Sequence, residues 1–129
     1  MLSGIGVDIV EIQRFQRMFD RFGDRIARRI LTDREFQQFE KRHRSLTFLA
    51  TRFAAKEATS KALGTGIAKG IGFHAIEVVN NELGQPELQL HGAAKALAER
   101  NGIRQALLSL SDEKHYAVAM VVLEAVSTP

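Results

Sequence analysis

Two acidic side chains of this 129-residue sequence stand in apolar surroundings, where a carboxylate is energetically unfavourable. Asp8 interrupts a run of Ile, Val and Gly that is typical of a strand, an element in which Asp is disfavoured. Glu57 lies four residues after Phe53, along the apolar side of an Ala-rich segment with helical periodicity. Mg²⁺ prefers sites where one or two carboxylates leave other positions to water and phosphate. We therefore predict a magnesium site at Asp8 and Glu57.

Simpler interpretations of the two carboxylates stay open. Asp8 could bond a turn or pair with an Arg, and Glu57 could form an i, i+4 salt bridge with Lys61, worth about 0.2–0.5 kcal/mol on an exposed helix. Spacing alone favours these interpretations, because nothing local shows that the strand of Asp8 and the helix of Glu57 meet. Gly4 and Gly6, on the same strand face as Asp8, favour a ligand because they leave the backbone open to close approach.

Basic residues near Glu57 indicate a phosphate-bearing ligand. Lys61 lies one helical turn after Glu57 on the same face, and Arg52 and Lys56 form an adjacent row. Guanidinium and ammonium groups both bind phosphate oxygens. Arg52, Lys56 and Lys61 are therefore candidate phosphate contacts.

A second basic group crowds residues 14–34, where seven arginines are opposed by three aspartates. The arginines are Arg14, Arg17, Arg21, Arg25, Arg28, Arg29 and Arg34. The net charge of the whole chain is only +3, so this positive charge is concentrated locally. Such a surface attracts an acidic protein, a phosphate-rich ligand or nucleic acid.

The periodicity of apolar residues predicts the elements that must position these side chains. Alternation predicts strands over 2–10, 73–79, 87–91, 104–111 and 116–125. Helical spacing predicts helices over 11–22, 25–30, 46–63 and 92–101, and a capping box at Thr32 and Glu35 begins another that runs to about His43. The inward side of the first helix is expected to consist of Ile12, Phe15, Met18, Phe19 and Phe22.

These elements predict an α+β fold in which a mostly antiparallel sheet packs against the long helix over 46–63 and shorter helices. The length fits a single domain over residues 1–129, whose limited interior would place a large ligand in a surface cleft or a subunit interface. The sequence has no Cys, no start resembling a signal peptide, and no apolar run near the roughly 18 residues that span a bilayer. We therefore expect a cytoplasmic protein with no membrane partner.

Three stretches resemble the signatures of the holo-acyl-carrier-protein synthases, the short members of the 4′-phosphopantetheinyl transferase superfamily. The opening signature is similar to Gly4–Ile12 followed by Arg14. The second is similar to Arg52–Ala58 with Ser60–Ile67, and the third is similar to Ser109–Ala117. The order and spacing match over essentially the whole chain. The resemblance implies the family's fold and its reaction, in which 4′-phosphopantetheine passes from coenzyme A to a serine of apo-acyl-carrier protein for fatty acid biosynthesis, releasing adenosine 3′,5′-bisphosphate.

The resemblance also implies roles for particular positions. In the family, the residues matching Asp8 and Glu57 hold Mg²⁺, and the residue matching Lys61 lies by the pyrophosphate of coenzyme A. The family is homotrimeric, with each active site between two subunits. Some members carry His where Asp112 stands, so no role is assigned to this residue.

In such a reaction we expect Asp8, Glu57 and Lys61 to be catalytic, because displacement at phosphorus depends on positioning and charge neutralisation. Glu57, acting directly or through a metal-bound water, is the preferred base for the serine hydroxyl. Arg52 and Lys56, together with Lys61, are candidate contacts for the phosphates of coenzyme A.

Because acyl carrier proteins are acidic, the arginine-rich first helix is the predicted docking surface. Its expected contacts are Arg14, Met18, Arg21 and Arg25. A solvated basic face without a partner is the simpler interpretation of the same residues.

Two other functions fit parts of the sequence. One is a non-catalytic nucleotide- or RNA-binding module, but the chain has no Trp, one Tyr and eight Phe that mostly fall on apolar stripes, which leaves few rings to stack on bases. We therefore expect no nucleic acid partner. The other is a phosphopantetheinyl transferase for peptide or polyketide carriers, a group usually built from two fused halves and longer than this chain.

Overall fold

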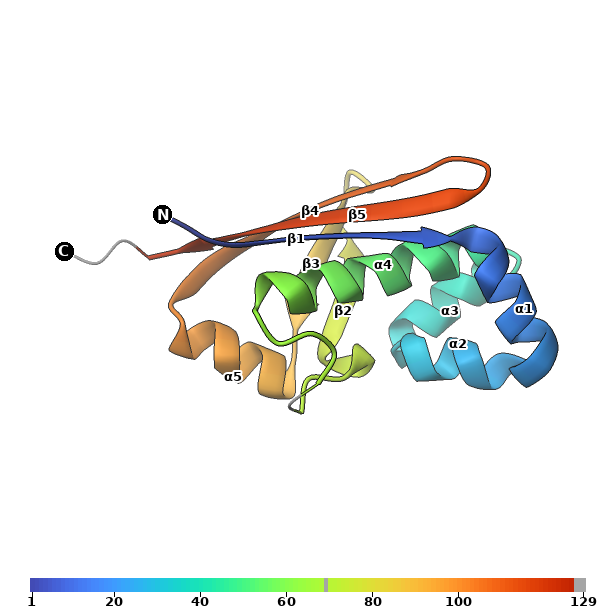
Figure 1. Cartoon of the computed structure of the whole chain (residues 1–129), viewed down its shortest axis with the longest axis horizontal. Coiled ribbons are helices and arrows are strands. Elements are labelled where there is room, and N and C mark those ends of the chain that lie inside the picture. Colours follow the sequence, from blue (N-terminus) through green and yellow to red (C-terminus); the bar gives the residue numbers. More distant parts are fainter. Residues whose placement is uncertain (69, 127–129) are drawn as a thin grey trace.

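The computed structural model describes residues 1–68 and 70–126, and Figure 1 traces its elements along the chain. The strands are β1 (Leu2–Glu11), β2 (Ile76–Asn80), β3 (Pro86–Leu90), β4 (Ile103–Asp112) and β5 (Tyr116–Ala125). The helices are α1 (Ile12–Phe22), α2 (Asp24–Ile30), α3 (Asp33–Lys41), α4 (Leu46–Ala62) and α5 (Gly92–Arg100). The strand predicted over 73–79 begins instead as a short 3₁₀ helix, η1 (Phe73–Ala75).

The strands form two antiparallel sheets, which confirms the α+β class. β1, β5 and β4 make a three-stranded sheet in that order, and β2 pairs with β3 in a hairpin. β5 lies in the middle, so that Asp8 of β1 stands opposite Ala119 of β5 and Asp112 of β4 stands opposite Ala117. The helices lie on one side of the three-stranded sheet (Figure 1), with α4 running beneath β1.

Helix α4 packs on the covered face of this sheet at unusually close range. A Cβ atom at Gly6 would lie 1.9 Å from the carbonyl oxygen of Ala58, and one at Gly4 would lie 2.2 Å from that of Ala62. Glycine is therefore required at both positions of β1. Our expectation that these glycines open the strand to a ligand is wrong, because the backbone of α4 takes the space.

Helices α1, α2 and α3 cover α4 on its other side, and aromatic rings of α1 and α3 pack against rings of α4. The rings of Phe15 and Phe53 meet edge-on with centroids 5.2 Å apart, and Phe39 lies 6.3 Å from Phe48. The capping box at the start of α3 is present as predicted. The helix ends at Lys41 rather than near His43, because the residues at 43 and 44 take φ angles of 58° and 57°, outside the right-handed helical region.

The prediction that Phe22 faces inward is wrong. This last residue of α1 is 42% exposed, whereas the other apolar residues predicted on that side are buried or half-buried. The guanidinium carbons of Arg21 and Arg25 lie 5.2 and 5.9 Å from the centroid of the Phe22 ring. The ring is therefore held at the surface between two cations.

The face of the three-stranded sheet that the helices leave open is apolar. Ile5, Val7 and Ile9 of β1 are 69%, 55% and 64% exposed. Their partners on β5 are Val122, Met120 and Val118, respectively. A contiguous apolar surface of this kind is unusual on a monomer and marks a candidate interface.

Within residues 1–68 and 70–126, no helix has both the length and the hydrophobicity that crossing a bilayer requires.

Candidate functional site

The structure brings Asp8 and Lys61 together across the contact between β1 and α4. The ammonium of Lys61 donates to Asp8 Oδ1 at 3.0 Å and to the carbonyl oxygen of Val7 at 3.0 Å. The Asp8 side chain is 15% exposed and that of Lys61 is 49% exposed, so the pair lies at the mouth of a partly buried site. Lys61 therefore makes its ion pair with the strand carboxylate, not with Glu57 as the helical spacing suggested.

Glu57 lies close enough to Asp8 for the two carboxylates to repel each other. Burial raises the pKa of Glu57, and the negative charge of Asp8 raises it further, while Lys61 and Arg14 oppose the shift. The residues of strand and helix thus form one electrostatic cluster. Spacing alone did not show that these two elements meet.

The side of α4 that carries Glu57 is its open edge, not an apolar stripe as predicted. Between Phe48 and Ser60, every residue is buried except Phe53 and Glu57. Lys61 continues the same line at the exposed end of the helix. α4 thus presents one accessible row, which carries the carboxylate and the ammonium of the predicted site.

The donor set at this edge fits a divalent cation with oxygen preference. Asp8 Oδ2 is buried and has no hydrogen-bond partner among the described residues, a condition that a cation would relieve. Burial, with the negative charge of Asp8 second, raises the pKa of Glu57, and a cation between the two carboxylates would oppose both effects. No group of three or more His, Cys, Asp and Glu side chains suited to metal occurs in the described part of the chain. A cation between Asp8 and Glu57 would keep positions for water and a substrate, as Mg²⁺ does.

Arg14 links this cluster to the basic surface of α1. Its guanidinium carbon lies 5.5 Å from the centroid of the Phe53 ring, and its charge lowers the pKa of Glu57. The side chains of Arg21 and Arg25 are exposed further along, and Met18 is half-buried. The four predicted docking residues therefore lie along one surface that leads to the carboxylates.

Sequence reasoning missed the apolar part of this surface. Phe22, Arg25, Ile26 and Arg29 line a shallow cavity of about 180 Å³ at the junction of α1 and α2. The signal was present in the sequence, because Phe22 is flanked by arginines on a helix whose apolar side is already filled by earlier residues. Helical spacing assigned it to the core instead.

Arg52 occupies a different side of α4. It is 6% exposed, its guanidinium carbon lies 4.1 Å from the centroid of the Phe48 ring, and its Nε has no partner among the described residues. Burial, followed by the charge of Arg42, lowers the pKa of Arg52 to about 10. A cavity of about 420 Å³ lined by Arg42, His43, Arg52 and Asp112 opens beside it. The concentration of cations there suits an anion.

Lys56 does not belong to a basic row on the surface. Its side chain is fully buried, and its ammonium donates to Glu35 Oε1 at 2.6 Å and to the carbonyl oxygens of Ile30 and Phe73 at 2.7 and 3.0 Å. All three ammonium protons are used inside the protein. The structure therefore gives no support to a contact between Lys56 and a phosphate ligand.

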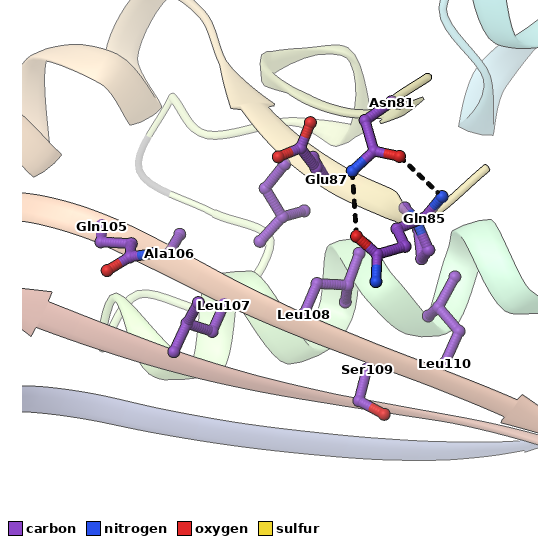
Figure 2. A pocket seen from close by; sticks show the side chains of 11 residues that line it. Asn81, Gln85, Glu87, Gln105, Ala106, Leu107, Leu108, Ser109 and Leu110 are labelled. Carbon is purple, nitrogen blue, oxygen red and sulfur yellow. Dashed lines mark hydrogen bonds between the residues drawn. The ribbon is translucent and has the colours of Figure 1, made fainter. Parts of the chain in front are cut away.

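Another concavity lies away from all of these residues. It measures about 460 Å³ and lies between the β2–β3 hairpin and β4 (Figure 2), lined by residues such as Asn81, Gln85, Leu108 and Leu110. The side-chain oxygen of Asn81 accepts from the backbone nitrogens of Leu83 and Gln85, which orders the hairpin turn. No predicted site residue lines this concavity.

Comparison with known proteins identifies relatives over almost the whole chain. Residues 4–121 match the family described as the 4′-phosphopantetheinyl transferase superfamily. The chain is 52% identical over 124 residues to the holo-[acyl-carrier-protein] synthase of Klebsiella pneumoniae (strain 342), which covers 96% of this chain and 98% of the relative.

Solved structures give the same result. The crystal structure of holo-[acyl-carrier-protein] synthase from Neisseria meningitidis superposes with a TM-score of 0.89 at 42% identity, covering 96% of this chain and 99% of that one. A holo-(acyl-carrier-protein) synthase from Bacillus anthracis str. Ames, solved in complex with CoA (3′,5′-ADP), superposes with a TM-score of 0.80 at 42% identity. The match covers 98% of this chain and 99% of that chain.

Proposed function

The chain belongs to the 4′-phosphopantetheinyl transferase superfamily, and we propose that it transfers 4′-phosphopantetheine from coenzyme A to a serine of apo-acyl-carrier protein. The observation that carries this proposal is the meeting of Asp8, Glu57 and Lys61 where β1 crosses α4. A carboxylate pair beside a fixed ammonium suits a pyrophosphate substrate, which needs both a cation and direct charge neutralisation. The relatives named above supply the substrate class.

Asp8 and Glu57 are the residues that would hold Mg²⁺. Bound there, Mg²⁺ would neutralise the charge that develops on the pyrophosphate oxygens. Lys61 supplies a second, permanent positive charge from the protein itself. The carbonyl oxygen of Val7 holds its ammonium in place beside Asp8, so the charge needs little reorganisation during the reaction.

The reaction forms a bond between the serine oxygen and the phosphorus next to pantetheine, and it breaks the bond from that phosphorus to adenosine 3′,5′-bisphosphate. The serine proton must be accepted as the new bond forms. Glu57 is the proposed acceptor, because it is the half-buried carboxylate that lies beside Asp8 and Lys61 in this site.

The carrier protein is proposed to dock on the surface of α1 and α2. Arg14, Arg21 and Arg25 face an acidic partner, while Met18 and the exposed ring of Phe22 supply apolar contact. Arg14 places the catalytic end of this surface next to Glu57. The basic face therefore has a use in this reaction without nucleic acid.

The phosphates of coenzyme A that lie away from the reacting centre are proposed to contact Arg52. The guanidinium is stacked on Phe48, which fixes its direction, and Arg52 lines the cavity described above. Its neighbours Arg42 and His43 would share the charge of such a phosphate.

We also propose that the chain acts as a homotrimer with each active site between two subunits. The exposed apolar face of β1 and β5 supports an assembly, and Asp8 lies between Val7 and Ile9 of the same strand, with Glu57 on the neighbouring α4. Neither Asp8 nor Glu57 lines any of the three cavities described above, and a second subunit would supply further walls for the site.

The proposal is tested by incubating the protein with coenzyme A, Mg²⁺ and apo-acyl-carrier protein and measuring the carrier by mass spectrometry. The carrier should gain one phosphopantetheine group, and it should gain none when coenzyme A is omitted. A carrier protein whose acceptor serine is replaced by Ala is the matched control. Unchanged mass of the wild-type carrier at high enzyme concentration would contradict the proposed function.

A further inference from the structure

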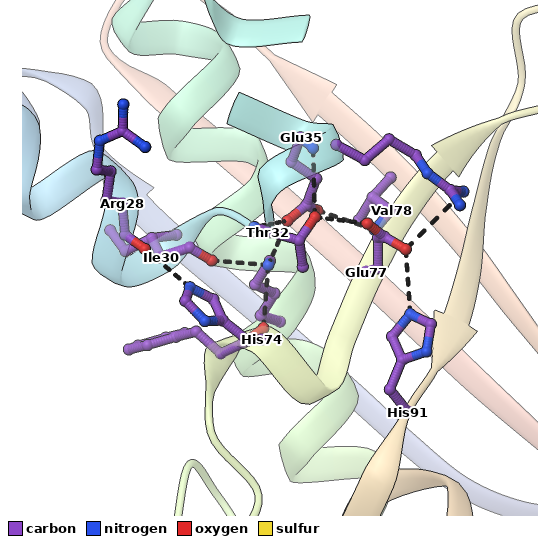
Figure 3. A network of polar contacts seen from close by, with 11 residues as sticks. Arg28, Ile30, Thr32, Glu35, His74, Glu77, Val78 and His91 are labelled. Atoms are coloured by element: carbon purple, nitrogen blue, oxygen red, sulfur yellow. Dashed lines mark hydrogen bonds and ion pairs between the residues drawn. The ribbon is translucent and has the colours of Figure 1, made fainter. Parts of the chain in front are cut away.

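A fully hydrogen-bonded polar cluster lies behind the site, on the buried side of α4. Lys56 is at its centre, and its three donors reach three separate segments: the end of α2, the first turn of α3, and η1. Figure 3 shows Ile30, Glu35 and the strand residue Val78 converging on this point. The ammonium therefore joins α4 to most of the structure on that side.

The partners of Lys56 are themselves fixed. Glu35 is buried and accepts from the backbone nitrogens of Thr32 and Val78 at 2.8 and 2.9 Å, in addition to Lys56. The hydroxyl of Thr32 donates to Glu77 Oε2 at 2.5 Å, which anchors the same cluster to β2. The carboxylate that receives Lys56 thus has little freedom to move.

Side-chain packing alone does not fix the exact position of α4, so directed hydrogen bonds such as those of Lys56 can determine it. Most of its buried residues are small, and the alanines at 50, 54, 55 and 58 are fully buried. Helices are located by side-chain ridges that enter grooves, and alanines form only shallow ridges. A helix packed mainly through alanines can rotate or slide slightly at small loss of contact, whereas three directed hydrogen bonds from one ammonium cannot be kept if it does.

Lys56 and Glu57 are neighbours in sequence, so they point about 100° apart around the helix. Fixing the direction of one therefore fixes that of the other. Net stability is a poor reason to bury an ion pair, because the loss of hydration offsets much of the attraction. Directional geometry is a better reason at a helix that carries a candidate site on a neighbouring side.

We propose that Lys56 is a positioning residue: its three hydrogen bonds set the rotation and axial position of α4 and thereby hold Glu57 and Lys61 opposite Asp8. This inference rests on the proposed function. Under this proposal Lys56 positions the helix from inside the protein, and the adjacent Glu57 acts in the site.

The test compares Lys56→Met with Ile76→Ala, a matched control that destabilises the core from β2, where Ile76 is fully buried. Both proteins are assayed well below their melting temperatures. Lys56→Met should lower kcat and raise the Mg²⁺ concentration for half-maximal turnover, each by about tenfold, because misplaced catalytic groups and lost supporting contacts have effects of this size. The KM for the carrier should stay within about twofold, since the docking surface lies on α1 and α2.

A binding measurement separates positioning from activity. Calorimetric titration of Mg²⁺ into the protein saturated with coenzyme A should show weaker binding for Lys56→Met and unchanged binding for Ile76→Ala. If Lys56→Met does not fold, Glu35→Gln is measured in its place, because it removes the charged acceptor and keeps the ammonium. Its shifts should go in the same direction.

Wild-type kcat and Mg²⁺ binding in the folded Lys56→Met protein would overturn the positioning role, as would equal changes in the Ile76→Ala control. If Lys56→Met is unfolded, wild-type values for Glu35→Gln would do the same. These results differ from failure of the proposed function, in which the wild-type protein itself would not modify the carrier.

Discussion

The carboxylate of Asp8 and the ammonium of Lys61 lie 3.0 Å apart, although one belongs to the first strand and the other to the end of α4. Their contact exists because β1 presents glycine to the helix, so that the two backbones nearly touch. The same approach brings Glu57 within electrostatic range of Asp8. Close packing between strand and helix is thus the structural basis of the site.

Replacing Gly6 should damage both stability and turnover. In Gly6→Ala, the new Cβ would collide with the carbonyl oxygen of Ala58 and push α4 away from β1. We expect a loss of about 1–3 kcal/mol in the free energy of unfolding, measured by urea denaturation, and a larger Mg²⁺ requirement. Gly72→Ala is the control, since nothing lies within 4 Å of its Cβ position and its φ is not positive. Equal behaviour of the two variants would contradict the close-packing explanation.

Glu57→Gln should stabilise the metal-free protein at neutral pH. The pKa of Glu57 is raised in the folded state, so folding favours its protonated form, and the ionised carboxylate opposes folding at pH 7. The advantage of Gln should shrink as the pH falls through the folded pKa and vanish below the ordinary value of 4.5. Melting curves in EDTA across this range measure the effect.

Adding Mg²⁺ should make the wild type more stable than Glu57→Gln. A cation that binds only the folded protein raises its melting temperature, and the binding needs the Glu57 carboxylate. The wild type should therefore gain stability with Mg²⁺ while Glu57→Gln gains little. Destabilisation by Glu57→Gln in EDTA at pH 7 would show that the carboxylate has a structural role instead.

Charge reversal on the docking surface should act on the carrier protein alone. Arg25→Glu should raise the KM for the acyl carrier protein at least about fivefold at low ionic strength, with a smaller effect as salt screens the charges. The KM for coenzyme A should change little. Arg100→Glu, on the exposed end of α5, is the matched control. Equal weakening of both substrates would argue against docking on α1 and α2.

The polar cluster behind α4 should make the stability of the folded protein depend on pH in the acidic range. Burial alone would raise the pKa of Glu77, but hydrogen bonds from Thr32 and His91 and the charge of Arg34 outweigh it and lower the pKa. A lowered pKa contributes stability above the ordinary value of 4.5, and this contribution is lost as the pH falls through the folded pKa. Glu77→Gln should therefore melt below the wild type at pH 7 and approach it in acid. A pH-independent difference would contradict this.

The exposed face of β1 should control assembly. Val7→Glu places a charge among Ile5, Ile9 and Met120, and we expect the trimer to dissociate and turnover to fall with it. Light scattering coupled to size-exclusion chromatography measures the mass of the particle. Lys95→Glu, on the exposed surface of α5, is the control. A wild-type protein that is monomeric at micromolar concentration would contradict the proposed assembly.

The elements were predictable because local signals carry them, whereas the three candidate site residues were predicted from residue types and the family resemblance. Each of these signals spans only a few residues: strand alternation, the capping box at Thr32 and the glycines that end helices. The motifs around Asp8, Glu57 and Lys61 resemble family signatures. Contacts between distant segments were not predictable in the same way. The pairing of Lys61 with Asp8 depends on how closely α4 packs against β1. No local sequence pattern predicts that distance.

The burial of Lys56 and Arg52 shows where periodicity fails. A helix with one apolar side should present its cations to water, but α4 is covered by a sheet on one side and by α2, α3 and η1 on the other. Its open side is the narrow row of Phe53, Glu57 and Lys61. The error at Phe22 is the reverse one, because helical spacing places this ring inside whereas it lies at the surface between Arg21 and Arg25.

A double-mutant cycle on the two carboxylates tests the site most directly. Carrier modification is measured against Mg²⁺ concentration for the wild type, Asp8→Asn, Glu57→Gln and the double variant. We predict that each single change abolishes activation by Mg²⁺ in the physiological range and that the double change is no worse than either, because both side chains serve one ion. Near-normal turnover and unchanged Mg²⁺ dependence in either single variant would contradict a shared magnesium site.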